Sequence, residues 1–173
     1  MHASDYKALI RHMEWADALI WKTVLSLSSL EHDGWIRERL HHVHSTQWAY
    51  GQLLRGQPVE IPALNSFPDL RSIGLWARQF YVMESARFER LDETELQRKV
   101  DFPQTAEIVK RFGSAASPTV GESILQLIMH TTYHRGQLCR RLREAGGEPP
   151  STDFISWIWM QRPPAAWVHF ETT

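Results

Sequence analysis

The sequence has little of what several classes of protein need. A single cysteine, Cys139, excludes an internal disulfide framework and is typical of a reducing compartment, so we expect a cytoplasmic protein. The 19 basic and 20 acidic side chains give a net charge of −1. That balance leaves no excess of positive charge for a phosphate backbone, so we expect no nucleic-acid partner.

Long apolar runs are also missing. No uncharged apolar stretch approaches the roughly 20 residues that span a bilayer. Charged residues interrupt the first fifteen positions, which predicts no cleaved signal peptide. No internal repeat or low-complexity segment is visible. Domains commonly hold roughly 100–150 residues, so the 173 residues predict a single domain over 1–173 without a membrane anchor.

What the sequence does contain is helical patterning. Apolar residues recur every three or four positions in four stretches, which is typical of amphipathic helices. Two of the connections between them are ten or more residues long, which favours crossover connections over tight turns. The fold class expected is therefore all-α, a four-helix bundle with long crossover loops. The helices expected cover residues 4–27, 35–55, 67–91 and 118–146.

The ends of these helices carry recognisable signals. Ser4 and Ser66 are expected N-caps, and Ser117 followed by a proline is expected to open the last long helix. Gly56 and Gly146 are expected stops.

Two further segments are less regular. We predict short extended pieces or ordered loop at KVDFP (99–103) and EIVKRF (107–112). The proline-rich C-terminal part predicts one short helix that begins near Ser151 or Asp153.

A pair of histidines on the last long helix is the first candidate for chemistry. His130 and His134 stand one turn apart, so both rings project from one face and could grip one metal ion. In the H-E-x-x-H pattern of zinc peptidases, the residue after the first histidine is a glutamate that acts as general base. Here that position is Thr131, which excludes this peptidase mechanism. The pair therefore needs a ligand from another helix.

The second helix offers His41, His42 and His44. At 100° per residue, His44 lies roughly 80° from the centre of the apolar stripe, His42 roughly 120° away on the other flank, and His41 further round. Helical periodicity does not choose among them.

The motifs resemble those of the DinB-like superfamily of bacterial metal-binding four-helix bundles. The run H-x-x-x-H-R-G-Q at 130–137 resembles its signature, and E-W-A-D at 14–17 is similar to its early W-A-N, with Asp17 where asparagine is common. HVHSTQWAY at 42–50, with Gly56 after it, and GGEPPSTD at 146–153 are similar to two further family motifs. The resemblance implies His42, His130 and His134 as metal ligands, with His44 as the fallback.

The resemblance also implies a chemistry. Three neutral imidazoles leave a coordination position open, and the family suggests nickel or zinc as the ion. Characterised members of the superfamily, bacillithiol transferases and a mycothiol-dependent maleylpyruvate isomerase, use thiols. We therefore expect a metal-dependent thiol S-transferase, or a related hydrolase or isomerase, that acts on a small-molecule electrophile with a low-molecular-weight thiol. A homodimer is also expected. The alternative left open is a metal-binding stress-response bundle without turnover.

Four neighbours of the histidine pair have weaker expectations. Gln137 could contact a metal ligand, and Arg135 could hold a carboxylate of a cosubstrate. Gly136, in mid-helix, suggests the close approach of a neighbouring helix. Cys139 is expected to pack as a small hydrophobic residue.

Overall fold

The computed structural model describes residues 1–103 and 105–170. Within these residues the regular structure is helical, apart from one isolated antiparallel bridge between Lys99 and Thr119. This confirms the all-α class. Among the described helices, none combines the length and apolar content of a membrane span. The long helices are α1 (Ala3–Ser26), α2 (Gly34–Leu54), α3 (Leu70–Glu89) and α6 (Val120–Glu144); the short ones are η1 (Ser28–Leu30), η2 (Leu64–Ser66), α4 (Glu93–Gln97), α5 (Thr105–Phe112) and α7 (Phe154–Trp159).

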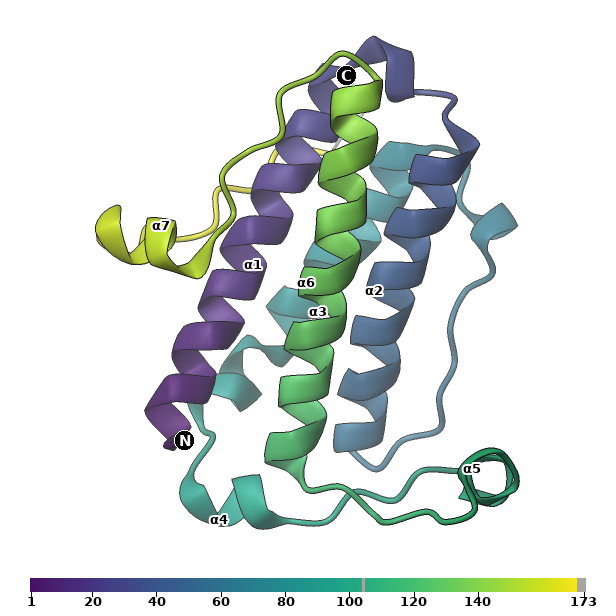
Figure 1. Cartoon of the computed structure of the whole chain (residues 1–173), viewed down its shortest axis with the longest axis vertical. Coiled ribbons are helices and arrows are strands. Elements are labelled where there is room, and N and C mark those ends of the chain that lie inside the picture. Colours follow the sequence, from purple (N-terminus) through teal and green to yellow (C-terminus); the bar gives the residue numbers. More distant parts are fainter. Residues whose placement is uncertain (104, 171–173) are drawn as a thin grey trace.

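The four long helices run side by side (Figure 1). Helix α1 packs against α3 and α6, and α2 packs against the same two helices. The connection from α2 to α3 follows one side of the molecule, whereas the connection from α3 to α6 crosses one end and carries α4 and α5 (Figure 1). The second crossover is therefore not a plain loop.

The helix starts differ from those expected from serine residues. The N-caps of α1, α3 and α6 are His2, Asp69 and Thr119 rather than Ser4, Ser66 and Ser117. Asp69 accepts a hydrogen bond from the Ser72 N–H, and Thr119 accepts one from the N–H three residues on. The expected serines lie two or three residues from the observed N-caps.

The expectation of a short extended piece or ordered loop at EIVKRF was wrong, because these residues belong to α5. Val109 and Phe112 are residue types common in strands, yet in α5 both side chains are exposed. In KVDFP, Lys99 does form the bridge to Thr119, but the segment goes no further than that single pair.

The C-terminal segment contains the expected short helix, α7, with Asp153 at its N-cap position. The Asp153 side chain makes no capping hydrogen bond. Beyond α7 the chain returns to the long helices: the indole N–H of Trp167 donates to Glu14 at 3.0 Å, and the ring of Phe170 lies against Gly74 of α3. A side chain on residue 74 would overlap that ring, which explains a glycine inside a helix.

A buried polar network joins all four long helices. The Asp17 carboxylate of α1 accepts hydrogen bonds from the Tyr81 hydroxyl of α3, at 2.6 Å, and from the Gln47 amide of α2, at 2.7 Å. Arg135 of α6 lies 3.5 Å from the other carboxylate oxygen, and the side chains of this ion pair are only 5% and 6% exposed. His44 extends the network, since it donates to the Gln47 side chain. One carboxylate therefore fixes how α2, α3 and α6 are turned about their axes.

We expect Asp17→Asn to lower the free energy of unfolding by about 3–5 kcal/mol, because it leaves Arg135 as an unpaired buried charge. Glu89→Gln is the matched control: its ion pair with Arg11 is more than half exposed, so the loss should stay below about 1 kcal/mol. Urea-induced unfolding measures both. Equal losses in the two variants would contradict a structural role for the buried pair.

Candidate metal centre

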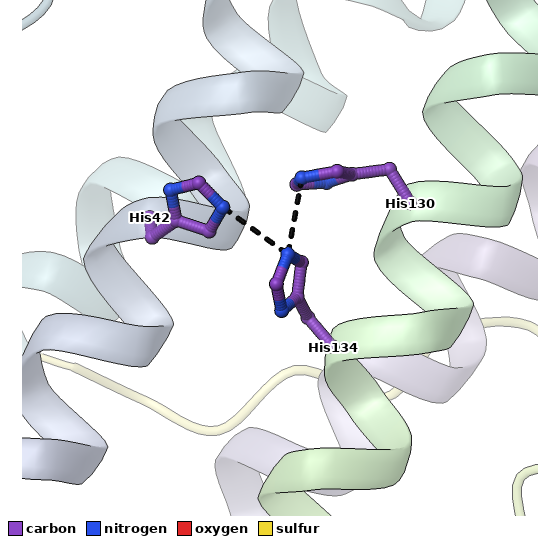
Figure 2. A group of neighbouring side chains, drawn as sticks. All are labelled: His42, His130 and His134. Carbon is purple, nitrogen blue, oxygen red and sulfur yellow. Dashed lines mark hydrogen bonds between the residues drawn. The ribbon is translucent and has the colours of Figure 1, made fainter.

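Three histidines from two helices bring their Nε2 atoms together between α2 and α6 (Figure 2). The Nε2 atom of His134 lies 3.1 Å from that of His42 and 3.1 Å from that of His130. All three nitrogens lie within 4.8 Å of one another. These are the three residues that the family resemblance implies as ligands.

Helical geometry explains why the three histidine side chains lie together. His130 and His134 are one turn apart on α6, and the packing of α6 against α2 places His42 opposite them. His134 is buried, His130 is half-buried and His42 is exposed. The cluster is therefore closed on the side of the core and open to solvent on the side of His42.

The donor set fits a divalent ion. Three nitrogens at about 2.0–2.1 Å from one tetrahedral ion would lie roughly 3.3 Å apart, close to the two separations of 3.1 Å. Without an ion, one ring nitrogen faces two others at hydrogen-bond distance, although a neutral imidazole carries a single N–H. A shared cation would satisfy all three lone pairs at once.

The rings of His130 and His42 are also in the protonation state that coordination requires. Burial, followed by the neighbouring rings of His134 and His42 and by Arg39, lowers the pKa of His130 to about 4. Burial likewise lowers the pKa of His42. Both imidazoles are therefore neutral at pH 7, and neutral imidazole is the form that binds metals.

Gln137 contacts His134 at Nδ1, the ring nitrogen that is not part of the cluster. Its Oε1 atom lies 2.8 Å from Nδ1 of His134, where it accepts a hydrogen bond if that nitrogen carries the proton. This arrangement leaves the Nε2 lone pair of His134 free for an ion and holds the ring in place. The structure thus shows the expected contact of Gln137, with the side chain of His134.

The other two histidines of α2 are occupied elsewhere. His44 is buried, accepts a hydrogen bond from the Trp21 indole at 2.9 Å and donates to Gln47 at 2.8 Å, so both of its nitrogens belong to the core network. His41 stacks on Trp76, and its Nε2 lies 2.8 Å from the carbonyl oxygen of Pro62. The structure brings His42, and neither neighbour, to the pair on α6.

Thr131 faces away from the cluster. It is fully buried, and its hydroxyl lies 3.4 Å from the Gln47 amide nitrogen, within the core network. The position that holds the glutamate of an H-E-x-x-H peptidase therefore faces the core here.

Two expectations for the neighbours of the pair were wrong. Arg135 cannot hold a cosubstrate, because it is buried against Asp17. Gly136 is exposed, and a side chain built there would meet nothing within 4 Å, so none of the described helices approaches it closely. The expectation for Cys139 was right: it is half-buried, it packs at the edge of an apolar cluster, and burial raises the pKa of its thiol.

Sequence reasoning missed Arg39. This side chain reaches from α2 to α6, where its Nη1 atom lies 3.2 Å from Nδ1 of His134. The signal was present, because residue 39 precedes His42 by three positions and so lies one turn away on the same face.

Comparison with known proteins gives one family. The model of the DinB family matches residues 74–167, more than half of the chain. The match includes His130 and His134 on α6, whereas His42 on α2 lies outside it. No curated protein matches the sequence significantly.

We expect His42→Ala to weaken binding of zinc and nickel at least about 100-fold, since loss of an outer hydrogen-bond partner alone commonly costs roughly 10–100-fold. His41→Ala, one residue away on the same helix, should bind both ions as the parent does. Competition against a chromophoric chelator measures the affinities. Parent-like binding by His42→Ala would remove this residue from the ligand set.

Proposed function

The chain belongs to the DinB family, and we propose that it is a metal-dependent thiol S-transferase built as the four-helix bundle of that family. The convergence of three Nε2 atoms, closed toward the core and open at His42, is the observation that carries the proposal. A site that only stabilised the fold would be expected to have four protein ligands, whereas catalytic sites keep a position open.

We propose His42, His130 and His134 as the ligands and zinc or nickel as the ion. Imidazole suits both metals, and the group contains three histidines and no carboxylate or thiolate. Gln137 would hold His134 in the tautomer that presents Nε2 to the ion. The cytoplasm, where small thiols stay reduced, is the proposed location.

The proposed reaction joins the sulfur of a low-molecular-weight thiol to an electrophilic carbon. A bound dication supplies acidity, because a thiol that coordinates it is deprotonated near neutral pH. The S–C bond forms as the leaving group departs with its electron pair, and the thiol proton passes to solvent. The chain contributes the open face at His42 and the fixed ring of His134. No general base is needed at position 131, which agrees with a threonine that faces the core.

The proposal predicts that the metal-loaded chain conjugates a thiol with monochlorobimane, with loss of chloride. A panel of small thiols that includes bacillithiol and mycothiol, assayed by fluorescence with zinc or nickel, identifies the cosubstrate. Metal-free protein and His42→Ala should fall to the uncatalysed rate, while His41→Ala should keep the parent rate. If the chain binds the metal yet conjugates none of these thiols, the S-transferase is rejected in favour of the non-catalytic metal-binding bundle.

A further inference from the structure

A cleft of about 600 Å³ lies between the N-terminal part of α2 and the C-terminal part of α6. Two of its lining residues, Arg39 and Gln137, also contact Nδ1 of His134. The cleft and the histidine cluster therefore share a wall and belong to one groove between the two helices. Its lining residues are Trp35, Arg39, Gln137, Arg140, Arg141 and Glu144.

The arginines of this cleft differ in their partners. Arg140 pairs with Glu144 at 2.9 Å, and Arg141 pairs with Asp33 and with Glu144. Arg39 makes no ion pair with any part of the chain that the structure describes, and its Nε atom is buried without a hydrogen-bond partner. The three arginines and the two carboxylates, Asp33 and Glu144, have a net charge of one positive unit. Arg39 is the arginine whose charge no carboxylate of the described residues balances.

Neighbouring side chains fix the position of the Arg39 guanidinium but leave N–H donors of it without hydrogen-bond acceptors. Its guanidinium lies over the ring of Trp35, with its carbon 5.2 Å from the ring centroid. If His134 donates its Nδ1 proton to Gln137, that nitrogen has no lone pair left for Arg39. The N–H donors at Nε and Nη1 of the guanidinium then have no acceptor among the residues that the structure describes. A half-buried cation with fixed, unused donors is suited to an oxyanion.

We propose that Arg39 binds a carboxylate carried by the thiol or the electrophile that reacts at the histidine cluster; this inference rests on the proposed function. One unmatched positive charge suits a monoanionic carboxylate better than a phosphate dianion. Arg39 lies on the Nδ1 side of His134 and the three Nε2 atoms lie on the other side. The carboxylate and the reacting sulfur would thus lie on opposite sides of the His134 ring.

Two size-matched thiols test the inference on the metal-loaded chain. Calorimetry should find 3-mercaptopropionate bound more tightly than its neutral amide, 3-mercaptopropionamide, and Arg39→Met should remove this preference. Propionate, titrated into the metal-free chain with the arginine side-chain NMR signals as readout, should shift the Nε–H of Arg39. Because a charge-assisted hydrogen bond is lost, Arg39→Met should weaken propionate binding about tenfold. Arg140→Met, which removes an arginine already paired in the same cleft, should change it little.

The outcomes separate the two proposals. Propionate binding needs neither metal nor turnover, so it survives even if no thiol is conjugated. Equal propionate binding by the parent and Arg39→Met would overturn the carboxylate site and leave the S-transferase standing. Inorganic phosphate bound as tightly as propionate would overturn the choice of a carboxylate.

Discussion

The ion pair of Asp17 with Arg135 is the constraint on which the rest of the structure depends. Asp17 contacts a side chain of each of the other long helices, and a buried charge is tolerated only while its partners stay in place. The network therefore sets the rotation of α2 and α6. With Gln47 and Arg135 turned inward, His42 and His134 meet in the groove between those two helices, and the site follows from the core.

The histidines of α2 illustrate how much of the site could be predicted from the sequence. Apolar periodicity alone did not choose among His41, His42 and His44, because it shows which face of the helix is apolar and not which polar residue the core needs. The structure shows that His44 is needed there, between Trp21 and Gln47. The spacing from His42 to Tyr50 and Gly56 matches the family motif, and this resemblance indicated His42. In the structure His42 does lie against the histidine pair on α6.

The fold was predicted well where apolar spacing decides it and poorly where polar contacts do. All four long helices lie within three residues of the expected ranges, because their apolar stripes are long and regular. Arg135 was misplaced, since an arginine in a helix pattern indicates solvent unless its buried partner is known. Helix α5 was missed because its short segment of β-branched and aromatic residues has the composition of a strand.

The two helices that form the cluster are far apart in the chain, and His134 follows His42 by 92 positions. Under the proposed function, one ion held by both residues closes a loop that contains α3, α4 and α5. A covalent cross-link of this span would stabilise a fold by about 4–5 kcal/mol in the chain-entropy model. Coordination would thus give this chain a reversible long-range cross-link, which a single cysteine cannot provide.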